Sequence, residues 1–106
     1  MAKTAKKYKA KVKSKQIIKR RRVTFAMEAA GAREVILMGD FNNWNPNKHP
    51  MKSDANGMWN KTVMLPAGTY EYKFLIDGNW RLDPQNSRTC PNCFGSQNNV
   101  LNLSVP

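Results

Sequence analysis

From residue 23 onward, apolar side chains recur at every second position in several short stretches of the chain. The clearest of these stretches contains Tyr70, Tyr72, Phe74 and Ile76. A period of two is typical of a β-strand that buries one of its faces. By this pattern we expect strands over residues 23–28, 34–38, 59–65, 70–76 and 99–105.

Turn-forming residues separate these stretches. Asn56-Gly57 and Asp77-Gly78 are hairpin-turn dipeptides, because both residues of each pair tolerate a positive φ. Residues 40–51 and 83–97 have the Asn and Pro content of loops. Short strands between regular turns, with no helical run of useful length, predict an all-β sandwich or barrel.

The net charge of +11 lies entirely in the first part of the chain. Residues 1–22 contain eleven Lys and Arg and no Asp or Glu, whereas residues 23–106 hold equal numbers of bases and acids. Lysines alternate with other residues from position 7 to 15, so neither a strand nor a helix would bury enough to offset the ordering entropy. We therefore expect a disordered lysine-rich tail over 1–22 and one β-sandwich domain over 23–106.

Several features bear on where the protein resides. No stretch approaches the roughly 20 apolar residues that span a bilayer, and the basic N-terminus lacks the apolar segment of a secretory signal. Two cysteines in 106 residues do not make a disulfide framework. We expect a cytoplasmic protein without a membrane span.

The three tryptophans occur in different settings. Trp59 is in phase with Val63 and Leu65, which predicts a role in the core. Trp44 lies in a polar, Asn-rich loop, and Trp80 follows the Asp77-Gly78 turn. Loops run over the surface, and an exposed indole suits the apolar C–H face of a glucose ring. The alternative is that Trp44 and Trp80 each cap one end of the core, because Trp is usually highly buried.

Four blocks of sequence carry a family resemblance. They are GDFNNW at 39–44, LPAGTYEYKFLIDGNW at 65–80, DP at 83–84 and GSQNNV at 95–100. In order and spacing they resemble carbohydrate-binding module family 48, above all the glycogen-binding domain of the AMP-activated protein kinase β subunit. The resemblance covers about residues 23–105. It implies an immunoglobulin-like β-sandwich of the early-set type that binds α-1,4-glucan such as glycogen, starch or maltooligosaccharide.

The resemblance also implies a set of carbohydrate-binding residues. Trp44 and Trp80 would stack on glucose rings, and Lys73 and Asn98 would hydrogen-bond sugar hydroxyls. Phe94 stands where the family has a Leu that inserts into the glucan, and Ser96 replaces a usual Thr while retaining the hydroxyl. From the pattern alone, Lys73 points away from the core face, so its alternative is an ordinary solvated lysine. The alternative for Asn98 is a turn residue.

Cys90-Pro91-Asn92-Cys93 is a C-x-x-C pair that lies outside the family pattern. One such pair is half of a structural zinc site, and the single histidine, His49, is distant in sequence. Plain loop thiols in a reducing cytosol are the favoured interpretation. A local or regulatory disulfide, or a metal shared between two chains, are the alternatives.

No catalytic constellation is apparent in the sequence. Glycoside hydrolysis needs two carboxylates opposed across a cleft, and the aspartates of this chain lie at turns, where Asp is common for backbone reasons. The segment that begins at Asp77 lacks the acidic twelfth residue of a calcium loop, because position 88 is Arg88. We expect a binding protein without catalytic residues, cofactor or metal.

A different class of function centres on the tail. Clustered Lys and Arg bind phosphate backbones with an affinity that falls with salt, which would make the chain a binder of nucleic acid or another anionic polymer or surface. A third possibility is a docking module for a glycogen-metabolising enzyme.

Overall fold

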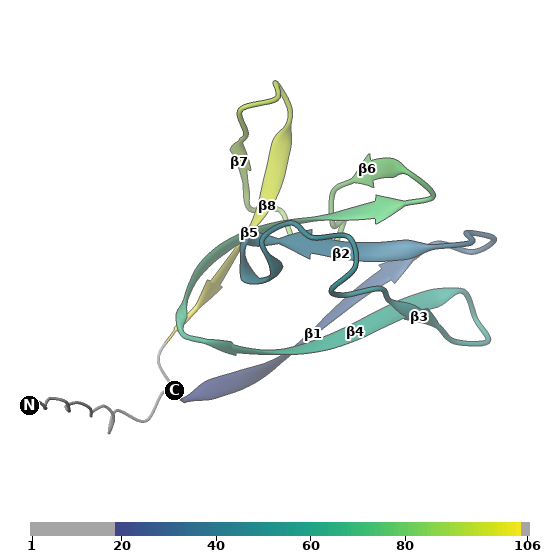
Figure 1. The fold of residues 1–106 in the computed structure, drawn as a ribbon, viewed down its shortest axis with the longest axis horizontal. Coiled ribbons are helices and arrows are strands. Elements are labelled where there is room, and N and C mark those ends of the chain that lie inside the picture. Colours follow the sequence, from purple (N-terminus) through teal and green to yellow (C-terminus); the bar gives the residue numbers. More distant parts are fainter. Residues whose placement is uncertain (1–18, 105–106) are drawn as a thin grey trace, which may run out of the picture.

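The computed structural model describes residues 19–104, which form two antiparallel sheets packed face to face (Figure 1). The three-stranded sheet has the order β1 (Arg20–Glu28), β4 (Met58–Pro66) and β3 (Lys52–Ser53). The second sheet has the order β2 (Val35–Gly39), β5 (Gly68–Ile76), β8 (Gln97–Leu103) and β7 (Thr89–Pro91), and β6 (Asn79–Arg81) also pairs with β5. A short 3-10 helix, η1 (Asp40–Asn42), follows β2. The predicted all-β, immunoglobulin-like sandwich is confirmed.

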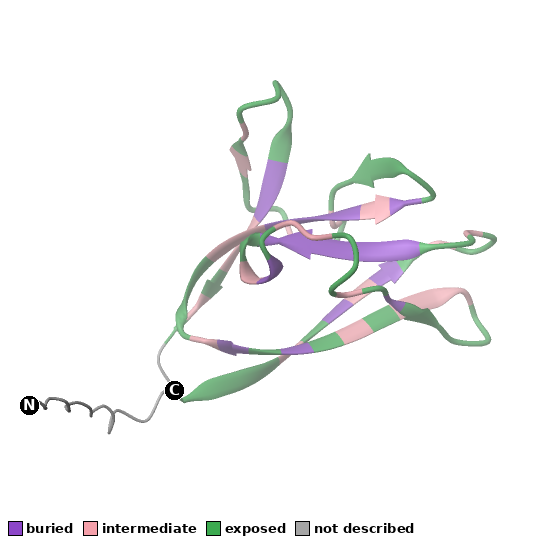
Figure 2. Ribbon diagram, in the orientation of Figure 1, coloured by how far each residue is buried: buried purple, intermediate pink, exposed green. Residues whose placement is uncertain are grey.

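The core lies between the two sheets, where both contribute alternate residues (Figure 2). Phe74 and Leu37 are fully buried, and aromatic contacts join Phe25 to Tyr72 and Phe41. Trp59 packs against this core, and its Nε1 donates to the carbonyl oxygen of Ala29 at 3.0 Å. The core role predicted for Trp59 therefore agrees with the structure.

The predicted turns join the strands as expected. Gly57 ends the turn before β4 with a φ of +83°, and Asp77 and Gly78 both have positive φ, at 48° and 83°. Those values are typical of the two-residue hairpin turn that links β5 to β6. Pro66-Ala67-Gly68 carries the chain from one sheet to the other, and the Tyr70 hydroxyl donates to the Pro66 carbonyl across it.

The three-stranded sheet includes the last three residues of the predicted tail. The strand β1 begins at Arg20, and Arg20 to Arg22 pair with Pro66 to Met64 of β4. Their side chains stay exposed while the backbone joins the sheet, so their charge does not oppose strand formation. Residues 1–18 of the predicted tail lie outside the described residues, and Lys19 is exposed.

Three short strands lie outside the stretches that were predicted as strands. β3 extends the three-stranded sheet, β6 follows the Asp77-Gly78 turn, and β7 occupies part of the predicted 83–97 loop. β7 forms because Cys90 pairs with Asn98 of β8, which itself begins at Gln97 rather than at residue 99. Such short elements carry no periodicity of their own and exist through pairing with longer strands.

β5 is the strand that organises the second sheet. One of its edges pairs with β2, and the other pairs first with β8 and then with β6. The ends of β2 and β8 and the whole of β6 therefore gather around β5. No helix among residues 19–104 is long and apolar enough to cross a membrane.

Candidate functional site

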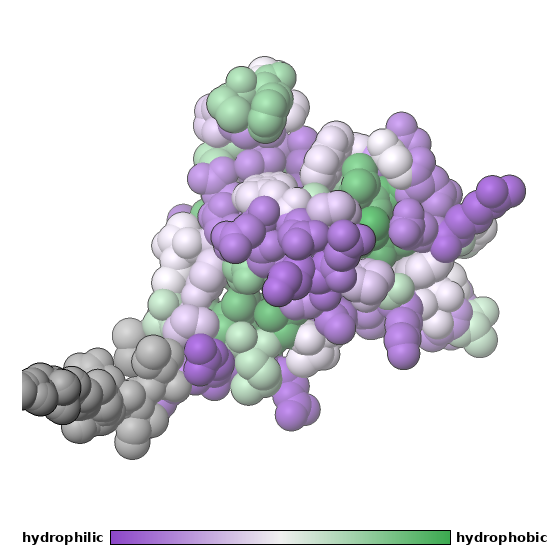
Figure 3. Space-filling view, viewed as in Figure 1, coloured by the Kyte–Doolittle hydropathy of each residue, from purple (hydrophilic) through white to green (hydrophobic). Residues whose placement is uncertain are grey.

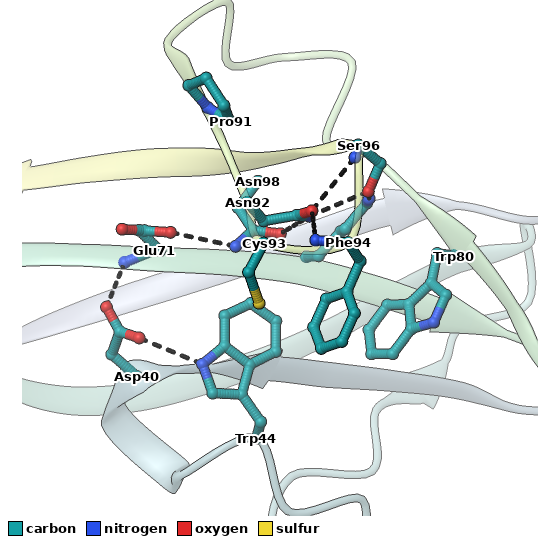
Figure 4. A pocket seen from close by; sticks show the side chains of 11 residues that line it. Asp40, Trp44, Glu71, Trp80, Pro91, Asn92, Cys93, Phe94, Ser96 and Asn98 are labelled. Atoms are coloured by element: carbon teal, nitrogen blue, oxygen red, sulfur yellow. Dashed lines mark hydrogen bonds between the residues drawn. The ribbon is translucent and has the colours of Figure 1, made fainter.

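A cleft of about 740 Å³ lies over the outward face of β5, on the side of the second sheet away from the core. Its walls come from the segment after β2, from β6 and from the turn between β7 and β8 (Figure 4). All six residues implied by the family resemblance line it. They are Trp44, Lys73, Trp80, Phe94, Ser96 and Asn98.

The segment that carries Trp44 is held by a buried asparagine. Asn42 is 5% exposed, its Oδ1 accepts from the backbone N–H of Gly39, and its Nδ2 donates to the Leu37 carbonyl and to His49 Nδ1. Gly39 is needed because a Cβ there would lie 2.8 Å from both the Glu71 carbonyl oxygen and the Phe41 ring. The first block of the resemblance therefore builds a tight turn at the end of β2.

Trp44 itself is fixed by Asp40. The indole Nε1 donates to Asp40 Oδ1 at 3.1 Å, and Asp40 Oδ2 accepts from the backbone N–H of Glu71 at 2.8 Å. Trp44 has a φ of +56°, which is unusual for a bulky side chain and costs on the order of 1–3 kcal/mol. This strained backbone turns the indole toward the cleft, where it is only half-buried.

Trp80 faces Trp44 across one end of the cleft. It lies on β6, opposite Leu75 of β5, directly after the predicted Asp77-Gly78 turn. The two indole centroids are 6.3 Å apart and their planes are inclined by 64°, so the rings meet edge to face. Trp80 remains 49% exposed, which leaves apolar ring surface available to a ligand.

Lys73 and Asn98 form the polar floor of the cleft, and neither is the solvated or turn residue of the alternative interpretation. Lys73 is 7% exposed and its Nζ donates to Ser96 Oγ at 3.2 Å. Asn98 is 8% exposed on β8, and its Nδ2 donates to Glu71 Oε1 at 3.0 Å. Both side chains leave the core face, as expected for Lys73, and are then covered by the turn between β7 and β8.

Phe94 is the most exposed large apolar residue of the described chain, at 87%. It lies at the tip of the β7–β8 turn, which stands out as an apolar spot at the top of the space-filling view (Figure 3). In the close-up its ring points toward the same opening as the two indoles (Figure 4). Three aromatic side chains thus surround the open side of the cleft.

The sequence analysis missed other residues that line the cleft. Asp40 was interpreted only as a turn residue, and Glu71 was not considered. Asn92 was considered only as the spacer of the C-x-x-C pair, although an Asn after Pro is a common turn former and could have been recognised as one. Pro91 and Cys93 also line the cleft.

Both cysteines are free in the structure, Cys93 exposed and Cys90 partly buried. Burial, and then a hydrogen bond to the Glu71 carboxylate, raise the pKa of the Cys90 thiol above its ordinary value. Within residues 19–104, no group of three or more His, Cys, Asp or Glu is placed to hold a metal ion.

The family of the chain follows from comparison with known proteins. A family model described as the glycogen recognition site of AMP-activated protein kinase matches residues 22–106. The chain therefore belongs to this family, and the resemblance suggested by the four sequence blocks is confirmed.

Similar proteins are larger than this chain. It is 38% identical over 73 residues to Protein PTST homolog 2, chloroplastic, of Arabidopsis thaliana, which covers 69% of this chain and 13% of that protein. It is 37% identical over 73 residues to the 5'-AMP-activated protein kinase subunit beta-1 of Sus scrofa, which covers 69% of this chain and 57% of the subunit. The crystal structure of a maltogenic amylase from S. marinus superposes with a TM-score of 0.69 at 21% identity, over 86% of this chain and 16% of the amylase, and supports the fold.

Proposed function

We propose that this domain binds α-1,4-glucan, such as glycogen, starch or maltooligosaccharide, in the cleft over β5 and does so without catalysis. The observation that carries the proposal is the combination of three aromatic side chains with a buried polar floor in one cleft. Membership of a glycogen-recognition family supports the choice of ligand.

The two kinds of surface suit the two faces of a sugar. The C–H groups of a glucose ring form an apolar face that packs on the exposed ring of Trp44 or Trp80. The hydroxyl groups at its rim need donors and acceptors, which Lys73, Asn98 and Ser96 supply. Phe94, on the exposed turn beside the indoles, adds a third apolar surface for the next sugar unit.

The polar floor is already ordered before a ligand arrives. Lys73 and Asn98 are each bonded to a neighbouring side chain and are less than a tenth exposed. Freezing a long side chain on binding costs about 0.5–1.5 kcal/mol, and most of that cost has been met during folding. This preorganisation raises the affinity for a weak ligand such as a short oligosaccharide.

The carboxylates of the cleft support a binding role. Asp40 uses one oxygen for the Trp44 indole and the other for the backbone of Glu71. Glu71 in turn accepts from Asn98. Each carboxylate holds a neighbouring part of the cleft through hydrogen bonds, which is a positioning role.

The test is a titration of maltoheptaose into the wild type and the Trp44→Ala, Trp80→Ala and double variants, with circular dichroism to verify folding. Stacking on an exposed aromatic ring is worth about 1–3 kcal/mol, by analogy with nucleic-acid bases. We therefore expect the double variant to bind at least about tenfold more weakly. Wild-type affinity in the folded double variant would place the site elsewhere, and no binding by wild type would refute the glucan proposal.

A second candidate function rests on the concentration of eleven basic residues within residues 1–22. We propose that this segment contacts an anionic polymer or surface, or a glycogen-metabolising enzyme, while the cleft binds glucan. Binding through the basic segment should fall steeply with salt, whereas maltoheptaose affinity should hardly change between low and physiological salt. Removal of residues 1–18, which contain seven of the eleven bases, should weaken only the salt-sensitive binding. We place both activities in the cytoplasm, where free thiols are stable.

A further inference from the structure

The turn between β7 and β8 carries two of the proposed sugar-binding residues but has little apolar packing of its own. Cys93, Phe94, Gly95 and Ser96 are all exposed. Exposed turns of this kind sample several conformations unless local hydrogen bonds select one. The placement of Phe94 and Ser96 over the cleft therefore depends on hydrogen bonds within and beneath the turn.

One side chain, that of Asn92, makes the bonds that close this turn (Figure 4). Its Oδ1 accepts from the backbone N–H of Phe94 at 2.9 Å and from that of Ser96 at 3.1 Å. Its own backbone N–H donates to the Ser96 carbonyl at 2.9 Å. Gly95, with a φ of +82°, provides the left-handed residue that brings Ser96 back toward Asn92.

The other half of the same amide joins the turn to the floor of the cleft. Asn92 Nδ2 donates to Ser96 Oγ at 2.9 Å and to Asn98 Oδ1 at 3.1 Å. Ser96 Oγ is also the partner of Lys73, and Asn98 is also the partner of Glu71. An amide side chain suits this position because it offers an acceptor and two donors at once.

We propose that Asn92 is a positioning residue for glucan binding, which holds Phe94, Ser96 and Asn98 in the arrangement that the sugar requires. The inference rests on the proposed function and adds a determinant that needs no contact with the ligand. Without this side chain the turn would occupy the binding arrangement only part of the time. The apparent affinity is the intrinsic affinity multiplied by the fraction of molecules in which the turn is correctly placed.

The test compares maltoheptaose affinity among variants whose folding is verified by circular dichroism and thermal unfolding. Asn92→Ala should bind about tenfold more weakly, as expected if roughly one molecule in ten retains the arrangement. Asn92→Asp keeps the oxygen that accepts from Phe94 and Ser96 but loses the donor to Asn98, so its affinity should lie between those of Asn92→Ala and wild type. Asn60→Ala, which removes an exposed amide on the other sheet, is the matched control and should bind as wild type.

A double-mutant cycle distinguishes positioning from a general structural effect. In a Phe94→Ala/Ser96→Ala background the same Asn92→Ala change should weaken binding by no more than about threefold, because two of the three side chains that it places are gone. A full loss in that background would overturn the inference, and so would wild-type affinity of Asn92→Ala or an Asn92→Asp protein as weak as Asn92→Ala. If wild type binds no maltoheptaose, the proposed function fails as well. If Trp44→Ala weakens binding and Asn92→Ala does not, only the role of Asn92 is refuted.

Discussion

Substitution of Gly39 by Ala should damage both the stability of the domain and its ligand site. The φ of Gly39 is −174°, so an alanine suffers no backbone strain there and the effect is purely steric. Its Cβ would lie 2.8 Å from the Glu71 carbonyl oxygen and 2.8 Å from the Phe41 ring. The Phe41 ring is able to rotate, but the carbonyl belongs to the paired strand β5 and moves only with the sheet.

The expected size of the effect follows from the cost of overpacking. Forcing an extra methyl group into a closely packed site destabilises by about 1–3 kcal/mol, which urea unfolding monitored by tryptophan fluorescence would measure. Relief of the clash requires β2 and β5 to separate where Asp40 accepts from the Glu71 N–H. Trp44, which is bonded to the same carboxylate, should then lose its position, and maltoheptaose affinity should fall severalfold.

The matched control is Gly31→Ala. No atom lies within 4 Å of a Cβ at Gly31, but its φ of +82° imposes backbone strain on any other residue. This variant should lose stability of about 1 kcal/mol and keep the glucan affinity of wild type. Wild-type stability and affinity in Gly39→Ala would refute the steric argument. A loss of affinity in Gly31→Ala equal to that in Gly39→Ala would show that the effect on the site is not specific.

Three further predictions concern residues outside the proposed sugar contacts. Trp59→Ala should lower the free energy of unfolding by about 3 kcal/mol, through lost packing and a lost indole hydrogen bond, and a stability close to wild type would refute its core role. Burial, aided by Lys61 and Lys48, lowers the pKa of His49 below its ordinary value of 6.5, and its Nδ1 must be unprotonated to accept from Asn42. The unfolded chain therefore takes up the proton more readily, so this contribution to stability is complete above pH 6.5 and is lost as the pH falls below that value. In wild type, the urea concentration at the unfolding midpoint should fall as the pH is lowered from 7 to 5. This part of the pH dependence should be absent in His49→Gln, which removes the single histidine. Cys90→Ser/Cys93→Ser should unfold as wild type, and Cys93 should be alkylated faster than Cys90 in the native protein; stoichiometric zinc with unfolding by a chelator would contradict both expectations.

The sequence by itself determined the class of fold and most of the residues that meet in the cleft. A period of two along residues 70–76 is a local property of an extended chain with one buried face, and Asn-Gly and Asp-Gly turns are equally local. The four sequence blocks identified the family, and through it Trp44, Trp80, Lys73 and Asn98 as neighbours. The pattern also predicted the direction of Lys73, away from Phe74 and the core.

The tertiary structure decided what surrounds those side chains. Lys73 points off the core face yet is buried, because the turn after β7 folds over it. That turn comes from a segment predicted as loop, and it is held by Asn92, whose role depends on the pairing of Cys90 with Asn98. Hydrophobic periodicity indicates only which of the two faces of a strand is turned toward the core. Which side chain of a distant segment lies above those faces depends on strand register and on turn geometry, and both are set by packing of the whole domain.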